Sequence, residues 1–226
     1  MAGDGLVQQI LVEKNRGTHE EVCLAVALAS GISCVEQPKV SSEDAERWER
    51  YLAGGFTKTV RRASKNAIHR AMTGPQRTFI EPFGFAVAAF IPMTLAETPK
   101  EITKQQVSDY EREHNMWSSV WNIGYSDKKY KGMKFPAICI NPHLEMSTGK
   151  AAAQAAHGMM SWAIKYGDTK TWERWDRAGN PTDLCSHEEC WLQEEGEDPP
   201  EIEIVDAGLT EIAPNSKTVI VRTIRY

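Results

Sequence analysis

A glycine followed by a lysine stands at the predicted start of a helix, in the segment Met146-Ser147-Thr148-Gly149-Lys150. Backbone N–H groups, the positive end of the helix dipole and an ammonium would meet there, which suits a phosphate or a carboxylate. The segment is not a P-loop, because that motif needs another glycine where Leu144 stands. A lysine exposed on the first helical turn without any role would have the same spacing, so this alternative stays open.

Two further polar residues share a helix face with Lys150. Gln154 and His157 follow it after four and seven residues, and the positions between them are alanines. Small neighbours leave such a stripe accessible and let the opposite face pack closely. The stripe therefore either lines a site or forms the solvated side of the helix.

A carboxylate and a hydroxyl come after a later predicted strand, in the segment Val205-Asp206-Ala207-Gly208-Leu209-Thr210. An aspartate at the end of a strand is commonly a turn former, which accepts hydrogen bonds from backbone N–H groups two residues on. In a functional site, Asp206 would instead hold a cationic or hydroxyl-bearing group. The spacing is compatible with both interpretations.

The elements that must position these residues form a pattern that occurs twice. β-rich runs, helices with small residues and helices with tryptophans follow one another in the order βααβαβ. This order predicts an α/β fold with three layers, α/β/α, around a mixed β-sheet, made of two pseudo-repeated halves. We expect the halves at residues 1–92 and 135–226, joined by a linking segment with one helix at 93–134.

The composition excludes several classes of protein. The chain has 226 residues, of which 41% are hydrophobic and 25% charged, and a net charge of −5. No run approaches the length of about 20 apolar residues that a membrane span needs, and the first residues predict no signal peptide. Five scattered cysteines favour a reduced, cytoplasmic protein, and the possible zinc ligands Cys185, His187 and Cys190 lack a fourth partner. The negative net charge excludes a protein that coats nucleic acid by bulk charge.

The positive charges are concentrated in two segments. No acidic residue occurs between Phe56 and Ile80, and a second basic group precedes residue 135. Such runs are either solvated faces or binding surfaces for a polyanion. The cations of the two segments that we consider for binding are Lys58, Arg61, Arg62, Lys65, Arg70, Lys128, Lys129 and Lys131.

Two blocks in the C-terminal half resemble the signature blocks of the type II peptidyl-tRNA hydrolases. They are MSTGKAAAQAAHG at 146–158 and DAGLTEIAPNSKTVIV at 206–221, and they occur in the family's order. The resemblance covers 135–226 well, although the middle strand and helix, at about 182–195, are reduced and unusually acidic. Residues 1–92 resemble the family only in element order, since Asn15 to Glu20 has neither the Gly-Lys pair nor the glutamine.

The resemblance implies hydrolysis of the ester that joins a peptide to tRNA, which recycles tRNA during translation. It assigns catalytic roles to Lys150, Asp206, Thr210 and Thr218, and substrate-positioning roles to Gly149, Gln154 and His157. It implies neither a metal nor another cofactor. The partner would be peptidyl-tRNA, with no membrane involved, and the basic segments of the N-terminal half would bind tRNA phosphates. The chain would be a monomer with pseudo-dimeric halves or a homodimer.

Two alternatives remain at this stage. The fold could bind tRNA or a protein without catalysing any reaction, which the acidic run Glu194-Glu195-Gly196-Glu197-Asp198 favours because carboxylates repel RNA. The chain could also hydrolyse a different acylated substrate. Turnover of a blocked aminoacyl-tRNA separates these alternatives.

Overall fold

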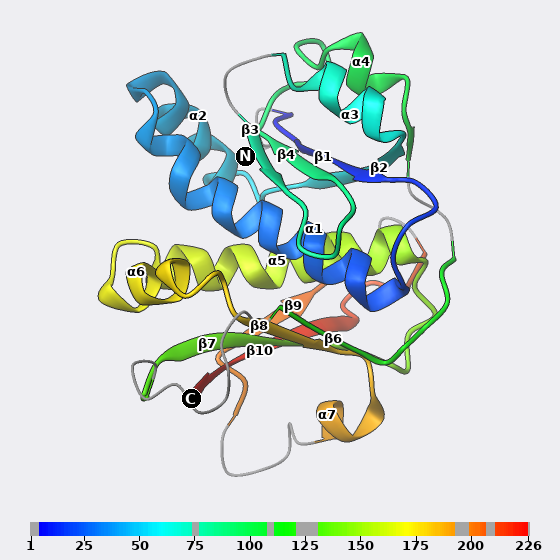
Figure 1. Ribbon diagram of the computed structural model, residues 1–226, viewed down its shortest axis with the longest axis vertical. Coiled ribbons are helices and arrows are strands. Elements are labelled where there is room, and N and C mark those ends of the chain that lie inside the picture. The colour runs from blue at the N-terminus through cyan, green and yellow to red at the C-terminus, as the bar shows by residue number, and fades with distance from the viewer. Residues whose placement is uncertain are drawn as a thin grey trace.

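The computed structural model describes residues 5–73, 77–107, 111–120, 131–192, 199–206 and 211–225. It confirms the predicted α/β class and the mixed strand directions. The strands form two five-stranded sheets rather than one, and two long helices lie between these sheets (Figure 1). Helices therefore cover both faces of each sheet, as predicted, but the layer between the sheets is shared.

The N-terminal sheet has the strand order β3-β4-β1-β2-β5. Its strands are β1 (Gln8–Glu13), β2 (Lys58–Ala63), β3 (Arg77–Ile80), β4 (Val87–Phe90) and β5 (Gln106–Val107). β1 and β2 are parallel, and the other neighbours are antiparallel. The accompanying helices are α1 (His19–Glu36), the 3-10 turn η1 (Gln37–Lys39), α2 (Ser42–Ala53), α3 (Lys65–Ala71) and α4 (Lys100–Thr103).

The C-terminal sheet has the strand order β6-β8-β7-β10-β9. Its strands are β6 (Trp117–Val120), β7 (Lys134–Ile140), β8 (Thr182–Cys185), β9 (Ile202–Val205) and β10 (Lys217–Arg225). β7 and β8 are parallel, and the other neighbours are antiparallel. The helices of this half are α5 (Thr148–Tyr166), α6 (Lys170–Arg177) and α7 (Glu188–Leu192).

The two halves have the same topology. Both run strand, helix, helix, strand, helix, strand, strand, with the first two strands parallel at the centre of the sheet. The predicted order lacked β3, because a four-residue strand is too short to show a period. The reduced middle strand and helix expected at about 182–195 are β8 and α7. The predicted linking segment 93–134 contains, besides the expected helix, the edge strand β5 of one sheet and the edge strand β6 of the other.

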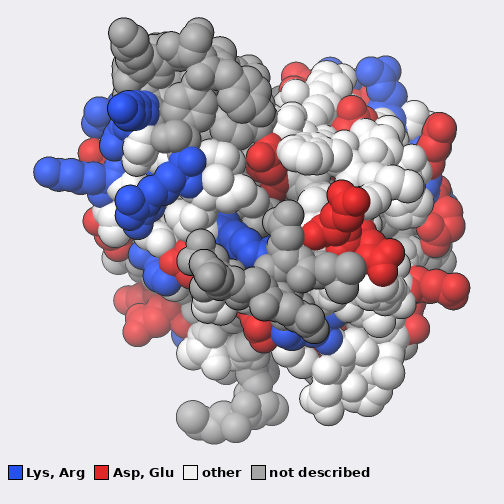
Figure 2. All heavy atoms as spheres, turned by 90° about the horizontal axis from the view of Figure 1, so that it is seen from below, with Lys and Arg blue, Asp and Glu red and all other residues white. Residues whose placement is uncertain are grey.

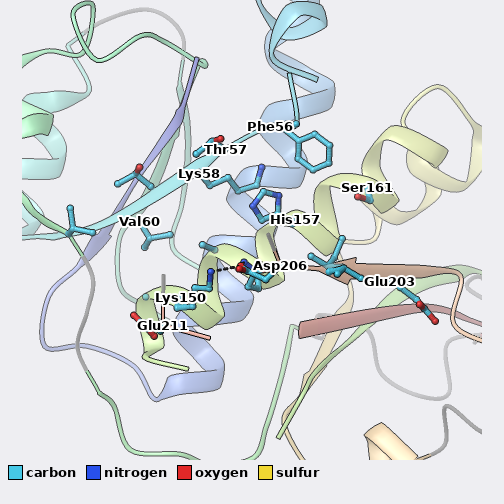
Figure 3. Close-up of a pocket in the computed structure, with 18 residues that line it drawn as sticks. Phe56, Thr57, Lys58, Val60, Lys150, His157, Ser161, Glu203, Asp206 and Glu211 are labelled. Atoms are coloured by element: carbon cyan, nitrogen blue, oxygen red, sulfur yellow. Dashed lines mark hydrogen bonds and ion pairs between the residues drawn. The ribbon is translucent and has the colours of Figure 1, made fainter. Parts of the chain in front are cut away.

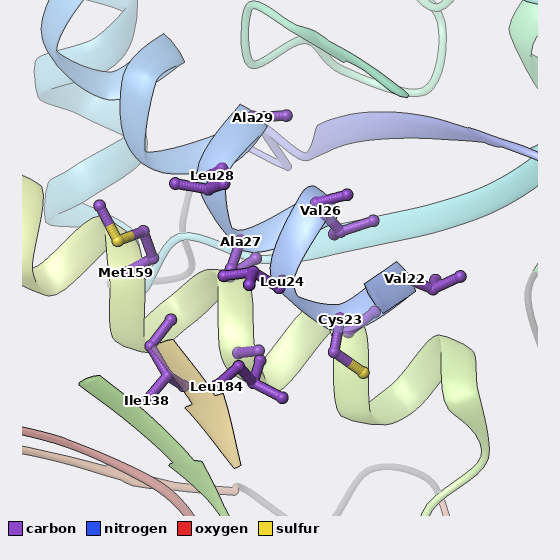
Figure 4. Close-up of a cluster of buried hydrophobic side chains, with 14 of the residues drawn as sticks. Val22, Cys23, Leu24, Val26, Ala27, Leu28, Ala29, Ile138, Met159 and Leu184 are labelled. Carbon is purple, nitrogen blue, oxygen red and sulfur yellow. The ribbon is translucent and has the colours of Figure 1, made fainter. Parts of the chain in front are cut away.

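Helices α1 and α5 are the first helices of the two halves, and they pack directly against each other. A capping box starts α1, since Thr18 Oγ1 accepts from the N–H of Glu21 at 3.3 Å and Glu21 Oε2 accepts from the N–H of Thr18 at 2.9 Å. Small residues permit the close approach: a Cβ atom at Gly31 would lie 2.7 Å from Met159 Cγ. Figure 4 shows Leu24 and Ala27 of α1 against α5. One hydrophobic core thus runs from the N-terminal sheet through both helices to the C-terminal sheet.

Arg61 of β2 is engaged within the fold. Its Nε donates to Gln9 Oε1 at 3.0 Å and its Nη1 donates to the carbonyl oxygen of Gln105 at 2.9 Å. A second contact from Nη1 reaches the carbonyl oxygen of Thr103 at 3.4 Å. The guanidinium therefore fastens the segment between α4 and β5 to the N-terminal sheet.

We expect Arg61→Met to lower the free energy of unfolding by about 1–2 kcal/mol, because these carbonyl and amide oxygens lose charged donors. Urea denaturation followed by circular dichroism measures the change. Arg70→Met is the matched control, since Arg70 is exposed on α3, and its unfolding midpoint should stay unchanged. Equal unfolding midpoints for wild type and Arg61→Met would contradict the fastening role.

None of the helices in the described ranges is both long enough and apolar enough to cross a membrane.

Candidate active site

The N-terminus of α5 is fixed by side chains from two parts of the C-terminal half. Ser147 caps the helix, and its Oγ accepts from the N–H of Lys150 at 3.3 Å. Glu211 in turn accepts from the N–H of Ser147 at 2.8 Å and from its Oγ at 2.7 Å. Glu211 belongs to the second signature block, but neither its type nor its spacing indicates this contact. This carboxylate holds the first turn of α5, with Gly149 and Lys150, beside the end of β9.

Lys150 and Asp206 form an ion pair, as Figure 3 shows. The exposed fractions of the two side chains are 12% and 7%, so the pair is largely shielded from water. The backbone N–H of Asp206 donates to the carbonyl oxygen of Ser216 at 2.9 Å, which fixes the carboxylate at the end of β9. A shielded pair is less screened by water and salt than a surface pair, so its charges exert a stronger local field.

A chain of hydrogen bonds extends from this ion pair. Gln154 Nε2 donates to Asp206 Oδ2 at 2.7 Å, and Thr218 Oγ1 donates to Gln154 Oε1 at 2.8 Å. The one hydroxyl proton of Thr218 is shared with the carbonyl oxygen of Ile204 at 3.1 Å. The four-residue spacing of Lys150 and Gln154 thus brings both side chains to one carboxylate. Among the residues proposed as catalytic, Lys150, Asp206 and Thr218 lie together, whereas Thr210 lies outside the described residues.

A pocket of about 650 Å³ opens beside these residues, and both halves of the chain line it. The C-terminal half contributes Gly149, Lys150, Gln154, His157 and Asp206. The N-terminal half contributes residues 55–60, which lead into and begin β2, and Val107 of β5. In Figure 3 the two sets face one another across the pocket. The site is therefore composite, although the sequence motifs lie in one half only.

His157 lies on the α5 face of this pocket, with its ring 5.3 Å from that of Phe56. Burial lowers the pKa of His157 well below its ordinary value, and the charges of Lys58 and Lys150 lower it further. The imidazole is therefore neutral at neutral pH. A neutral ring can accept a hydrogen bond and orient a substrate, whereas a base with so low a pKa removes protons weakly.

Lys58 lies in the pocket wall rather than on an exposed surface. Its Nζ donates to Tyr51 Oη at 3.1 Å and to Met160 Sδ at 3.2 Å. Burial lowers the pKa of Lys58 to about 7. The period of two in a strand could have indicated this position, since Lys58 shares a face with Val60, whose apolar side chain predicts burial.

The structure does not bring the other cations considered for tRNA binding into the pocket. Arg61 and Arg62 bond to the segment before and within β5, and Lys65 forms an ion pair with Glu81 at 2.5 Å. Arg70 and Lys131 are exposed, while Lys128 and Lys129 lie outside the described residues. Figure 2 shows basic and acidic side chains side by side across the described part of the face below the C-terminal sheet.

The topologically equivalent positions in the N-terminal half carry a different set of side chains. Counted from the helix start, Lys150, Gln154 and His157 correspond to Glu21, Ala25 and Leu28 of α1. Thr218 corresponds to Ala86, because Asn141 N–H donates to the carbonyl oxygen of Thr218 and Glu13 N–H donates to that of Ala86, each at 2.9 Å. Within the described residues, the C-terminal half carries this set of reactive side chains and the N-terminal half does not.

A disulfide joins Cys185 to Cys190. The expectation of reduced cysteines is therefore wrong for this pair, and neither sulfur is available as a zinc ligand. Within the described ranges, one other group could hold a metal: His19, Glu20 and His114, whose ligand atoms lie within 4.8 Å of one another. The carboxylate of Glu20 already accepts from Ser186 Oγ, from the N–H of Asn115 and from His114 Nδ1. These hydrogen bonds explain the cluster without a metal.

Comparison with known proteins identifies a family for part of the chain. No curated protein matches the chain in sequence. The model of the family described as peptidyl-tRNA hydrolase PTH2 matches residues 136–223. This range contains the whole chain of contacts from Lys150 through Asp206 and Gln154 to Thr218. Residues 136–223 therefore form a domain of the peptidyl-tRNA hydrolase PTH2 family.

Proposed function

We propose that this protein hydrolyses the ester bond between the peptide and the tRNA of peptidyl-tRNA. The observation that carries the proposal is the shielded ion pair of Lys150 with Asp206 in the wall of an open pocket, within a domain of a hydrolase family. A pocket of about 650 Å³ is of the size that accepts a small molecule or the end of a larger one. It suits the acylated terminal nucleotide, while the body of the tRNA stays outside.

The arrangement can meet the two requirements of ester hydrolysis, an oriented water and stabilisation of a developing oxyanion. The water oxygen forms a bond to the ester carbonyl carbon, and the bond from that carbon to the ribose oxygen breaks. One proton of the water passes to the ribose oxygen and the other is released to solvent, so the peptide leaves as its carboxylate. Asp206 orients the water and holds Lys150, whose ammonium stabilises the negative charge that grows on the carbonyl oxygen. Gln154 and Thr218 keep the carboxylate of Asp206 in place, and no covalent enzyme intermediate is needed.

We infer that one chain supplies both halves of a dimer-like unit. The equivalent helices α1 and α5 pack against each other as equal helices of two copies would, and both halves line the pocket. Phosphate contacts of the tRNA body remain a proposal for the exposed cations Arg70 and Lys131. Lys58, Arg61 and Lys65 have partners within the fold.

The test is release of N-acetylated amino acid from N-acetyl-aminoacyl-tRNA by the full chain, with Lys150→Ala as the matched variant. We expect turnover by the wild type and its loss in Lys150→Ala, because the variant lacks the cation of the pair. Turnover that persists in the variant contradicts the assigned role of Lys150. Salt-sensitive tRNA binding without turnover favours the non-catalytic alternative, and turnover only of simple acyl esters favours a different substrate.

A further inference from the structure

Lys58 is a buried cation that the N-terminal half places in the wall of the pocket. It stands at the first position of β2, and Figure 3 shows it projecting from that strand toward the part of the pocket where His157 lies. Its Nζ contacts Tyr51 Oη at 3.1 Å and Met160 Sδ at 3.2 Å, and lies 5.4 Å from the ring centroids of both Tyr51 and Phe56. Aromatic faces and neutral acceptors at these distances stabilise an ammonium.

The titratable groups that interact with Lys58 in the structure are neutral. They are the Cys34 thiol from α1, the Tyr51 hydroxyl from α2 and His157 from α5. Burial raises the pKa of Cys34 to about 12, so this thiol is neutral. Across the described residues, no carboxylate lies within ion-pair distance of Lys58 Nζ. The carboxylate of Asp206, which lines the same pocket, pairs with Lys150. A buried amine without a counter-ion lowers stability, and a hydrophobic residue of similar length would fill the same space without this cost.

An ammonium has three N–H donors, and two of those of Lys58 are used by Tyr51 and Met160. The third is available to a ligand in the pocket that this side chain lines. We propose that Lys58 is a substrate-binding residue that donates this hydrogen bond to a phosphodiester oxygen of the terminal nucleotide of tRNA. The inference rests on the proposed function for the identity of the ligand. The acylated end of peptidyl-tRNA offers no carboxylate at the ester, so this phosphate is the nearest anion.

The pKa of about 7 gives the proposal a pH dependence with a defined sign. Below pH 7 the ammonium is present and binds the anion directly. Above pH 7 the amine must take up a proton before it binds, so the affinity falls as the pH rises. A bound phosphate stabilises the ammonium and raises the pKa of Lys58 in the complex.

The experiment measures binding of cytidylyl-adenosine, the 3′-terminal dinucleotide of tRNA, to the full chain by calorimetry. Its phosphodiester keeps one charge over the whole pH range, and adenosine serves as the probe without phosphate. We expect Lys58→Met to weaken dinucleotide binding at about pH 6 by roughly tenfold or more, the effect of one charged hydrogen bond. Adenosine binding should change little. Wild-type affinity should fall by about tenfold between about pH 6 and 8.5, and the variant should show no such dependence.

The matched control is Lys100→Met, which removes an exposed cation outside the pocket lining and should leave dinucleotide binding intact. Lys58→Gln is a second variant that keeps a donor for Tyr51, in case the methionine variant does not fold. Equal dinucleotide affinity of wild type and either folded Lys58 variant overturns the proposal. So does an affinity that increases with pH, which would indicate that the neutral amine acts as a base.

Thermal unfolding distinguishes binding from a structural role. If Lys58 serves substrate binding rather than stability, Lys58→Met removes an unfavourable buried amine and should raise the Tm by about 5 °C. A lower Tm together with unchanged dinucleotide binding would indicate a structural role and overturn the proposal. Binding of the dinucleotide needs no catalysis, so this proposal can hold even if the wild type fails to hydrolyse peptidyl-tRNA, and it can fail even if hydrolysis is observed.

Discussion

Asp206→Asn is expected to reduce kcat/KM for peptidyl-tRNA by about 10³-fold, while the chain stays folded. Asparagine has the shape of aspartate, and its Oδ1 can still accept from Gln154 Nε2, a contact of 2.7 Å in the wild type. It cannot balance the charge of Lys150, whose side chain is only 12% exposed. The ammonium would then turn to another acceptor or to water, and the reaction would lose both the oriented water and the fixed cation. Single-turnover release of N-acetylated amino acid from tRNA measures the effect.

Thr218→Val is the matched control for this prediction. Thr218 acts on Asp206 only through Gln154, by the 2.8 Å bond from its hydroxyl. We therefore expect a loss of about tenfold, the effect of one neutral hydrogen bond in a positioning chain. Activity of Asp206→Asn within a factor of ten of the wild type would show that the ion pair is structural and that the reactive groups lie elsewhere.

The central part of the site could be predicted from the sequence because it depends on local spacing. One helix face relates Lys150 to Gln154 and His157, and Asp206 follows a strand within a recognisable block. Glu211 lies within the same block, but its contact with Ser147 crosses 64 residues and has no periodic signal. The basic run alone predicts an exposed binding surface for Lys58, because a charge pattern carries no information on the strand alternation. The structure places it in the pocket instead.

In the fold, too, short sequence patterns predict single elements, whereas the arrangement of the elements depends on contacts between residues distant in sequence. The capping box of α1 and the strand β7 follow from short patterns, and the structure contains both. The number of sheets depends instead on which long helices pack together. Small residues on α1 and α5 permit their contact, but nothing in either helix specifies the other as its partner. Edge strands of two or four residues, such as β5 and β6, acquire their structure only from the sheet that they join.

Glu20 shows how such distant contacts hold the two halves together. Its side chain is fully buried at the start of α1, in the N-terminal half. It accepts from Ser186 Oγ at 2.6 Å, from the N–H of Asn115 at 2.9 Å and from His114 Nδ1 at 3.0 Å. Burial alone would raise the pKa of Glu20, but these hydrogen bonds outweigh it and lower the pKa below its ordinary value. The carboxylate thus connects α1 to the segment before β6 and to the residue after β8.

We expect Glu20→Ala to lower the free energy of unfolding by about 3 kcal/mol, because it leaves a cavity and removes the acceptor of these three donors. Urea denaturation at neutral pH measures the loss, and the exposed Glu49→Ala should change stability by less than about 0.5 kcal/mol. Since the pKa is lowered in the folded state, the contribution of Glu20 is present above the ordinary carboxyl pKa and is lost as the pH falls through the folded value. The difference between wild type and variant should therefore shrink in acid. A difference that is small at neutral pH, or that does not depend on pH, would mean that the packing of α1 against α5 alone joins the halves.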